Sequence, residues 1–345
     1  MSQTYDFAVV IGRFSPCDNG HVERLSKIGE VAHRVLVLVS AADKARADRF
    51  PWTADEREAM LRAGLGAVAD TFVFGRVGDH TYAPASFADE VRQQFDAFRG
   101  TDTAGKVAVV SRAADVRPAA LSALPADWIR ITPPSGPDPS GLLAALYAAD
   151  DEGLAARVPS AVVEWLRAFR DTKIFSAMAA EHRYVEDYKR AWAVAPYPVI
   201  LVTTDLMAVQ PDAAGVPHVL LVRRGGIPGK GLWALPGGFL NPEEELVDGA
   251  LRELREETGL ALPDEALTAC LVASHPFADP ERSSRGRVIS HGFHFALPAG
   301  PLPVVAGADD AEHAVWLPLA ELPSLYGQFF EDHGAMIEYF LAGEA

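Results

Sequence analysis

The sequence lacks the features that mark secreted, membrane-spanning and nucleic-acid-binding proteins. Only two of its 345 residues are cysteine, Cys17 and Cys270, so no disulfide framework is predicted. The first residues do not have the pattern of a signal peptide and no apolar run is long enough to span a bilayer, so we expect a cytoplasmic protein with no membrane partner. Basic residues number 31 against 47 acidic ones, and the net charge of −16 argues against a nucleic-acid partner. Small nucleotides are still allowed, because arginines or a metal ion reverse the field at a local site.

The apolar content of 49% is sufficient for complete cores, and the length predicts two domains. In the first, expected over 1–176, strand-like and helical patterns alternate, which predicts a parallel sheet with helices on both faces. A polar helix or linker is expected at 177–195. The strands of the first domain are expected at 7–11, 34–39, 71–74, 106–110 and 128–131, and its first helices at 21–31 and 53–65.

The second domain, expected over 196–345, has the pattern of a mixed α+β fold. One strong helix is predicted at 244–258 and a last one at 334–341. A turn-forming segment lies at 211–217. Strands are expected at 199–203, 218–223, 269–274, 288–296 and 314–317.

Residues 238–260 carry a fixed pattern of glycine, five residues, Glu244, seven residues, and then Arg-Glu-Leu-Arg-Glu-Glu-Thr-Gly-Leu. On a helix, Glu253, Glu256 and Glu257 stand at i, i+3 and i+4, so they share one face. Three carboxylates on one face repel one another unless cations neutralise them, and oxygen ligands suit Mg²⁺ or Mn²⁺. Arg252 is placed to pair with Glu256 and orient this cluster. The pattern therefore predicts a divalent-metal site.

The remaining positions of the pattern fit the same interpretation. Gly237-Gly238 permits tight backbone geometry beside the metals, and Gly259 is placed to end the helix. The other face of the helix is apolar and is expected to pack on a sheet through Val247, Ala250, Leu251 and Leu254.

This pattern resembles the Nudix hydrolase family, and the resemblance covers 196–345. It implies that metals polarise phosphoryl oxygens and lower the pKa of a water that attacks a diphosphate. It also implies that Glu253 and Glu257 are metal ligands, with Gly238 beside them, and that Glu256 is a ligand or a base. Which carboxylate is the general base is left open, with Glu312 as a further candidate.

The flanking segments 220–224, 231–238, 279–282 and 285–287 resemble the ADP-ribose-hydrolysing branch of that family. The resemblance implies that Arg223, Arg282 and Arg287 bind phosphate or ribose oxygens. Taken singly, each of these arginines also fits an ordinary surface position. Trp233 is expected in the core rather than as a platform on which a base stacks.

A second motif, Gly-Arg-Phe-Ser-Pro-Cys-Asp-Asn-Gly-His at 12–21, follows the first strand and opens the first helix. It resembles the Gly-Arg-Phe-x-Pro-x-His-x-Gly-His signature of nicotinamide mononucleotide (NMN) adenylyltransferases. In that family phosphates bind at the helix N-terminus, so Gly12, Arg13 and His21 become candidate contacts for ATP or NMN. With Trp-Thr-Ala-Asp-Glu-Arg at 52–57, the chain resembles fused NMN adenylyltransferase–Nudix proteins over nearly its whole length.

Three positions depart from the transferase pattern. Asp18 replaces the first histidine, Leu143 stands where the family has an arginine, and segment 111–115 lacks the family's lysine. Losing one donor to a transition-state charge typically costs about 10²–10³ in rate. A nucleotidyltransferase-like (Rossmann-like) domain with inactive or impaired transferase chemistry is therefore expected.

The leading hypothesis is an enzyme that uses Mg²⁺ (or Mn²⁺) to cleave ADP-ribose, or a related nucleoside diphosphate, into AMP and ribose 5-phosphate. One alternative is a fully bifunctional enzyme of NAD metabolism that also retains the transferase activity. Another is a sensor that only binds nucleotides. The sequence fixes neither the preferred diphosphate nor the oligomeric state, so a homo-oligomer stays open.

Overall fold

The computed structural model describes residues 4–102, 104–112, 115–133 and 140–343, and it divides into two compact units, Met1–Ala179 and Ala180–Ala345. The division falls within helix α8 (Lys173–Trp192). The segment expected as a polar helix or linker is thus helical as far as Trp192. None of the described helices has the length and apolar character needed to cross a bilayer.

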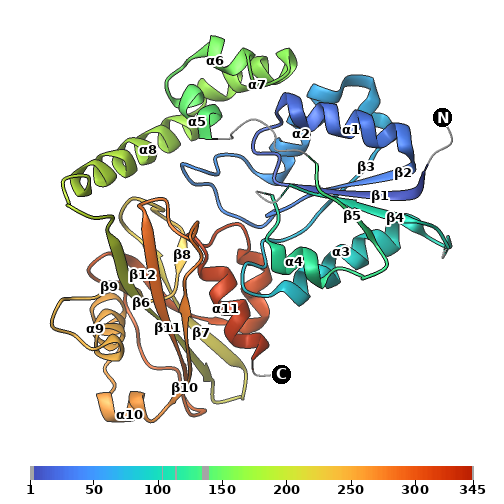
Figure 1. Ribbon diagram of the computed structural model, residues 1–345. Helices are drawn as coiled ribbons and strands as arrows, with labels where there is room; N and C mark the ends of the chain where they lie inside the picture. The colour runs from blue at the N-terminus through green and yellow to red at the C-terminus, as the bar shows by residue number, and fades with distance from the viewer. Residues whose placement is uncertain (1–3, 103, 113–114, 134–139, 344–345) are drawn as a thin grey trace. The chain divides into compact units, whose positions relative to one another are not determined.

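The first unit contains a five-stranded sheet with the order β3-β2-β1-β4-β5, and all of its strand pairs are parallel (Figure 1). This confirms the predicted α/β architecture. β3 begins two residues later than predicted, because a 3₁₀ turn (Gly66–Thr71) takes up the residues before it. The strands are β1 (Tyr5–Gly12), β2 (Ala32–Val39), β3 (Val73–Arg76), β4 (Val107–Val110) and β5 (Ile129–Ile131).

Burial on both faces explains why the central strands are continuous apolar runs. On β1, Ala8 and Val10 face one core, whereas Phe7, Val9 and Ile11 face the other. The helices α1 (Asn19–Val31), α2 (Ala54–Leu65), α5 (Ser140–Tyr147), α6 (Asp151–Ala155) and α7 (Ser160–Arg170) contribute to the first core. The helices α3 (Pro84–Arg99) and α4 (Pro118–Ala123) contribute to the second.

Of these helices, α2 was predicted from the sequence and α3 was not. Helix α2 begins where it was predicted to, because Thr53 and Glu56 form a reciprocal capping box. Helix α3 was not predicted, although its buried residues recur with helical spacing. They are Phe87, Ala88, Val91, Phe95 and Phe98.

The second unit contains a mixed sheet with the order β10-β11-β6-β7-β12, in which β8 pairs with β7 and β9 with β6. The pair β6–β11 is parallel, and the other pairs are antiparallel. The strands are β6 (Ile200–Pro211), β7 (Pro217–Arg224), β8 (Trp233–Ala234), β9 (Gly237–Phe239), β10 (Leu271–Phe277), β11 (Arg287–Ala296) and β12 (Ala311–Pro318). The remaining elements are α9 (Leu246–Thr258), α10 (Asp264–Thr268), η2 (Leu319–Leu325) and α11 (His333–Ala342).

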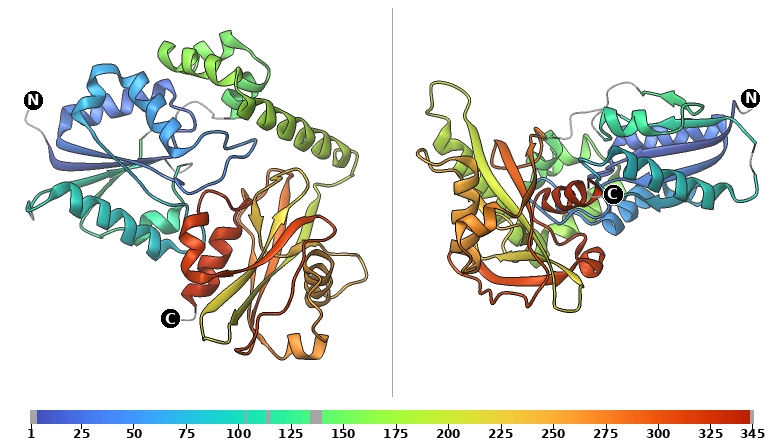
Figure 2. Two further views of the ribbon diagram at one scale, coloured as in Figure 1. Left: turned by 180° about the vertical axis from the view of Figure 1, so that it is seen from behind. Right: turned by 90° about the horizontal axis from the view of Figure 1, so that it is seen from below.

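Helices α9 and α11 cover opposite faces of this sheet (Figures 1 and 2). On the α9 side, Leu206 and Ala208 of β6 share a core with Leu251 and Leu254. On the α11 side, the Phe277 and Phe340 rings lie 5.4 Å apart, edge to face. The predicted packing of the apolar face of α9 on a sheet is confirmed.

Helix α8 contributes a buried contact to the second unit. Glu181 is buried, and its Oε2 accepts a hydrogen bond of 3.0 Å from the backbone N–H of Gly229. A fragment that begins at residue 196, the expected domain boundary, lacks this contact.

We therefore expect a fragment of residues 173–345 to unfold at a higher temperature than one of residues 196–345. A hydrogen bond to a charged group contributes about 1.5–3 kcal/mol. For a domain of this size that corresponds to a difference of about 5 °C. Thermal unfolding followed by circular dichroism measures this difference in melting temperature. The control is Glu181→Gln in the longer fragment, which keeps α8 but removes the charge of the acceptor. Equal melting temperatures for the two fragments would show that α8 adds nothing to this unit.

Candidate functional site

Helix α9 ends as its sequence predicts. Gly259 adopts a left-handed conformation with φ 64°, and its backbone N–H bonds to the carbonyl of Arg255. Ala250, Leu251 and Leu254 are buried on the sheet side. Of the acidic residues, Glu253 lies against Gly238 of β9 and Glu256 is exposed, whereas Glu257 is buried together with the apolar residues.

Arg252 links the carboxylates of this region. Its Nη1 donates to Glu253 Oε1 and to Glu256 Oε2, both at 2.8 Å, which confirms the expected pair with Glu256. Its Nε and Nη2 also bind the two oxygens of Glu244, an arrangement that was not anticipated. Hydrogen bonding to Arg252 lowers the pKa of Glu244 to about 2. Glu244, the isolated glutamate of the sequence pattern, thus fixes Arg252 from outside the cluster.

Glu257 is 5% exposed and sits against the Gly237-Gly238 turn. The backbone N–H of Gly237 donates to its Oε2 at 2.9 Å. Burial, with the neighbouring charges of Glu253 and Asp205 adding to it, raises the pKa of Glu257 to about 8, against the effects of Gly237 and Arg224. Burial also raises the pKa of Glu253. Two carboxylates that disfavour ionisation are therefore held close together, and a divalent cation would favour their charged forms.

The two glycines are required because the backbone lies against these side chains. A Cβ added at Gly238 would overlap the carboxylate of Glu253. A Cβ at Gly237 would overlap the backbone oxygen of Thr204 and the carboxylate of Asp205. The expected role of this pair in permitting close approach agrees with the geometry.

The donor set fits a hard divalent cation by its chemistry, which is carboxylate oxygen. Within the described ranges, no three ligating side chains are already gathered around one point. The reason is that Arg252 binds Glu253 and Glu256, whereas Glu257 turns to Gly237. Glu253 and Glu257 are the residues that would hold a metal.

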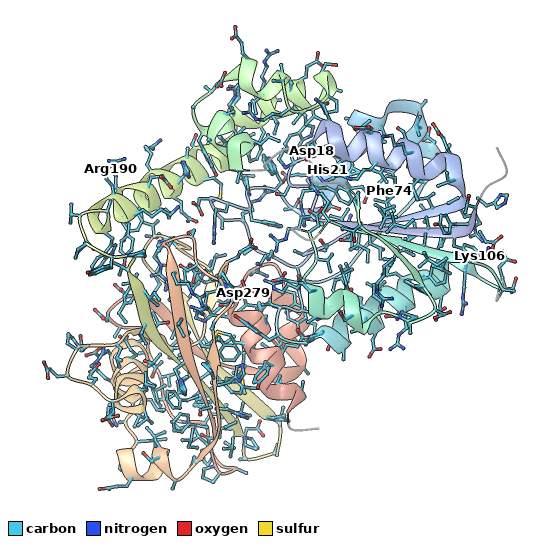
Figure 3. The ribbon with its side chains drawn as sticks, viewed as in Figure 1. Asp18, His21, Phe74, Lys106, Arg190 and Asp279 are labelled. Atoms are coloured by element: carbon cyan, nitrogen blue, oxygen red, sulfur yellow. The ribbon has the colours of Figure 1, made fainter. Side chains whose placement is uncertain are left out.

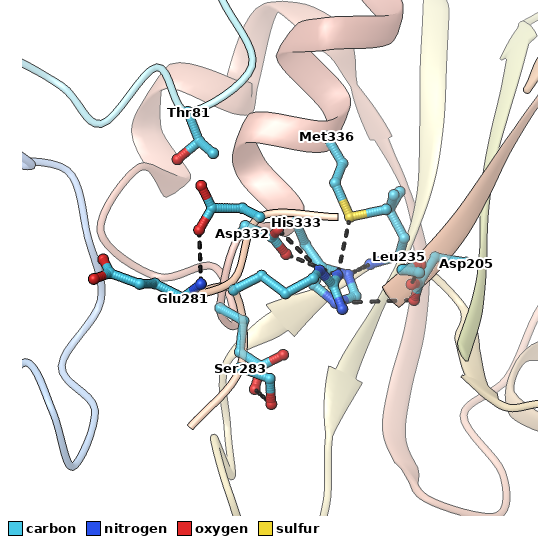
Figure 4. A network of polar contacts seen from close by, with 12 residues as sticks. Thr81, Asp205, Leu235, Glu281, Ser283, Asp332, His333 and Met336 are labelled. Carbon is cyan, nitrogen blue, oxygen red and sulfur yellow. Dashed lines mark hydrogen bonds and ion pairs between the residues drawn. The ribbon is translucent and has the colours of Figure 1, made fainter. Parts of the chain in front are cut away.

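Asp205 is a site residue that sequence reasoning missed. It lies on β6 with 4% exposure, accepts a hydrogen bond from the hydroxyl of Ser290, and raises the pKa of both Glu253 and Glu257. His333 Nε2 lies 3.8 Å from Asp205 Oδ1 (Figure 4). The signal that could have revealed it is an acidic residue within an otherwise apolar strand.

The three expected substrate arginines occupy different environments. Arg282 is 5% exposed and binds both carboxylate oxygens of Asp332, at 3.1 and 2.8 Å (Figure 4). Its guanidinium is thus already paired within the protein, and its expected contact with substrate stays a prediction. Arg223 donates to the carbonyl of Gly231 and lies 5.9 Å from the ring of Trp233, which is half-buried. Arg287 is half-buried and donates to the carbonyl of Ala278.

Arg285 is a second residue that sequence reasoning did not single out. Its guanidinium lies 5.2 Å from the ring centroid of Phe239 and 5.7 Å from that of Phe330. It also pairs with Glu331 at 3.7 Å. Phe239 directly follows the Gly237-Gly238 turn, so Arg285 lies against the side chain next to that turn. Glu312, the further candidate for a base, is exposed and pairs with Lys230 at 3.4 Å.

In the first unit, Asp18 caps helix α1 (Figure 3). Its Oδ1 accepts a hydrogen bond of 2.6 Å from the backbone N–H of His21. Arg112 Nη1 lies 3.2 Å from Asp18 Oδ2. Despite burial, which acts to raise it, hydrogen bonding to His21 and the charge of Arg112 lower the pKa of Asp18 to about 2. The charge of Asp18 is therefore compensated internally.

Both ring nitrogens of His21 are engaged inside the protein. Arg112 Nη2 lies 2.6 Å from His21 Nε2. The backbone N–H of Asp18 lies 3.0 Å from His21 Nδ1, which completes the reciprocal capping box of α1. Burial lowers the pKa of His21, which favours the neutral imidazole. A phosphate at Nε2 would have to displace Arg112.

Segment 111–115 lacks the lysine of the family pattern, but Arg112 supplies a cation in the same segment. Its Nε and Nη2 also bind Asp115, at 2.7 and 3.4 Å. Residues 113–114 and 134–139 lie outside the described residues. Leu143, on α5, packs against the core and carries no donor.

A small pocket lies at the carboxyl edge of the parallel sheet, the edge at which doubly wound folds bind nucleotides. Arg13 and Asp115 line it together with Ser40, Asp79 and Arg117. The backbone N–H of Arg13 lies 3.3 Å from Asp115 Oδ1. The ring of Phe14 lies 2.8 Å from where a Cβ on Gly12 would be, so the turn requires glycine there.

Comparison with known proteins identifies the second unit. Residues 205–340 match the family model of the NUDIX domain. An ADP-ribose pyrophosphatase of Methanocaldococcus jannaschii is 36% identical over 107 residues, which are 31% of this chain and 58% of that protein. This chain thus spans less than two thirds of that relative's length.

Two further proteins match the first unit or the whole chain. A nicotinamide/nicotinic acid mononucleotide adenylyltransferase of Acinetobacter baylyi is 22% identical over 182 residues, which are 52% of this chain and 94% of that protein. A crystal structure of a bifunctional NMN adenylyltransferase/ADP ribose pyrophosphatase from Francisella tularensis, complexed with AMP and a manganese ion, has a TM-score of 0.84 and 28% identity. That match covers 99% of this chain and 100% of the other.

The raised pKa of Glu257 leads to an expectation about metal binding and pH. Between its unfolded value, near 4.5, and about 8, the folded state without metal holds a proton that the unfolded state has lost. The stability of the metal-free protein therefore falls as pH rises through this window. A metal that displaces this proton binds up to about tenfold more tightly per pH unit.

Thermal unfolding with and without Mn²⁺ at pH 5.5, 7 and 8.5 measures this effect. We expect the stabilisation by Mn²⁺ to grow with pH. Glu257→Gln should remove most of it and stabilise the metal-free protein, whereas Glu243→Gln, on an exposed carboxylate outside α9, should change neither. A stabilisation that does not depend on pH would contradict the assignment of Glu257 as a ligand.

Proposed function

We propose that this chain, which carries a Nudix domain at residues 205–340, uses a divalent metal to hydrolyse ADP-ribose to AMP and ribose 5-phosphate. The observation that carries the proposal is the pair Glu253–Glu257, two carboxylates of raised pKa beneath the Gly237-Gly238 turn. The names of the Methanocaldococcus and Francisella proteins support ADP-ribose as the substrate.

The residues of the site would have separate roles in such a reaction. Glu253 and Glu257 would hold the metal, and Mg²⁺ or Mn²⁺ suits their oxygen ligands. When bound, the metal polarises phosphoryl oxygens and lowers the pKa of a coordinated water. Arg252, itself fixed by Glu244, keeps Glu253 and Glu256 in place. Arg285, beside Phe239, supplies a positive charge for a substrate phosphate.

For the first unit we propose a nucleotidyltransferase-like domain with impaired transferase activity. Adenylyl transfer needs donors aimed at the α-phosphoryl and pyrophosphate oxygens. The guanidinium of Arg112 is engaged by Asp18, His21 and Asp115. A nucleotide would have to break these internal contacts before its phosphates could bind the same side chains.

The second candidate is a fully bifunctional enzyme. The Francisella match over 99% of this chain, with 28% identity, favours it. The two candidates differ only in whether the first unit turns over NMN and ATP.

For the hydrolase, we expect Glu253→Gln and Glu257→Gln to lower kcat for ADP-ribose by about 10²–10³, the effect of losing one group that stabilises transition-state charge. Both variants should remain folded, because each exchange removes a charge that burial disfavours. Product identification with Mg²⁺ and with Mn²⁺, and complete inhibition by EDTA, complete the measurement. Glu243→Gln is the matched control. Near-normal turnover of either variant at saturating metal would refute the ligand assignment.

For the first unit, we expect NAD formation from NMN and ATP to be slower than about 1 s⁻¹, the lower end of ordinary enzyme rates. The assay uses a Glu253→Gln background so that the second unit cannot consume the product. Asp18→His alone should restore little, because Asp115 still engages Arg112 and Leu143 still offers no donor. A turnover above that value in the background protein would establish the bifunctional alternative.

A further inference from the structure

A groove of about 390 Å³ lies within the second unit, outside the carboxylate cluster. The end of α8, the segment that leads into β6, and the residues that lead into β11 form its walls. Its polar and aromatic lining consists of Lys189, Trp192, Tyr197, Arg285 and Arg287. The other lining residues are small or apolar, and none is acidic.

The chemistry of this lining matches a nucleotide. Trp192 is 45% exposed and Tyr197 is 80% exposed, so both rings are accessible to a flat ligand. Base–aromatic stacking is worth about 1–3 kcal/mol per base. The three cations provide hydrogen-bond donors for phosphate oxygens. Such a cationic lining is notable in a chain with a net charge of −16.

Trp192 is also held in place along α8. Its ring lies 6.4 Å from that of Tyr188, edge to face, and Tyr188 in turn stacks on Tyr184 at 6.5 Å. A ring that is already ordered loses little entropy when a base stacks on it.

Arg285 connects the groove to the turn beside the proposed metal site. It lines the groove, and its guanidinium lies 5.2 Å from the ring centroid of Phe239. Phe239 follows Gly238, which is in close contact with Glu253, and the carbonyl of Phe239 accepts a hydrogen bond from Arg252. This link through Arg285 and Phe239 is the reason to assign the groove and the carboxylates to one ligand.

We propose that this groove binds the nucleoside half of the diphosphate substrate, with the base against Trp192 and Tyr197 and with Arg285 and Arg287 on the adjoining phosphate. The inference rests on the proposed hydrolase function, since it assigns a subsite to that reaction. Stacking does not depend on the hydrogen-bonding pattern of a base. The groove therefore selects for the presence of a base more than for its identity.

The test uses the full-length protein and two readouts. The first is equilibrium binding of AMP and, separately, of ribose 5-phosphate, followed by calorimetry without metal. The second is steady-state hydrolysis of ADP-ribose. Trp192→Ala and Tyr197→Ala remove the stacking surfaces, and Trp192→Phe restores an aromatic ring. Val194→Ala is the matched control, because Val194 is 88% exposed in the same segment but does not line the groove.

We expect each alanine variant to raise KM for ADP-ribose about tenfold, with kcat within about twofold of the parent. AMP binding at one site should weaken by a similar factor, while ribose 5-phosphate binding should not change. Trp192→Phe should recover most of the loss, and Val194→Ala should behave as the parent. A nucleotide bound by the first unit would add a second binding site that none of these variants alters.

The two proposals fail in distinguishable ways. If ADP-ribose is cleaved normally and both alanine variants keep the parental KM and AMP affinity, the groove assignment is wrong and the hydrolase proposal stands. If the parent does not cleave ADP-ribose, but the alanine variants lose AMP affinity, the hydrolase proposal fails and the groove remains a nucleotide site. Equal weakening of AMP and ribose 5-phosphate would also overturn the assignment, because it would show a general structural effect.

Discussion

The second unit is organised around two glutamates, Glu253 and Glu257, whose burial makes their ionised forms unfavourable without a cation. Several otherwise unrelated features follow from this constraint. The Gly237-Gly238 turn lacks side chains because the carboxylates occupy the space beside it. Arg252 donates a hydrogen bond to Glu253 and is itself held in place by Glu244. Two buried carboxylates without a full counter-charge lower the stability of the metal-free fold. A divalent metal that supplies the missing charge makes the same arrangement favourable.

The first unit shows the opposite electrostatic arrangement. There Asp18, His21 and Asp115 meet one guanidinium, that of Arg112, and their donors and acceptors satisfy one another. A buried network of this kind is stable as it stands, and removing one member leaves an unpaired charge. Internal satisfaction therefore works against phosphate binding, because each donor offered to a ligand must first be taken from a carboxylate. The replacement of histidine by Asp18 matters less as a repulsive charge than as the partner that draws Arg112 and His21 inward.

The sequence predicted those parts of the sites that are encoded locally. The spacing of Glu253, Glu256 and Glu257, the end of α9 at Gly259 and the turn at Gly12 each depend on residues within a few positions of one another. The parts it missed depend on distant residues. Asp205 joins the cluster because β6 pairs with β9, and its charge interrupted the apolar pattern so that β6 was predicted too short. The pairing of Arg282 with Asp332 was not foreseen, because Asp332 lies 50 positions away. Arg112 was overlooked for the same reason, since its partner Asp18 lies 94 positions away.

The acidic character of the chain gives the cations of the second unit a particular importance. A net charge of −16 opposes the approach of a doubly charged diphosphate at long range. At physiological ionic strength, charges more than about 8 Å apart are largely screened, so the field within the site is set by the residues that line it. Arg285, next to Phe239, and Arg287 both line the groove, where no acidic residue offsets their charge. Under the proposed function, these cations supply the local positive field that the acidic chain otherwise lacks.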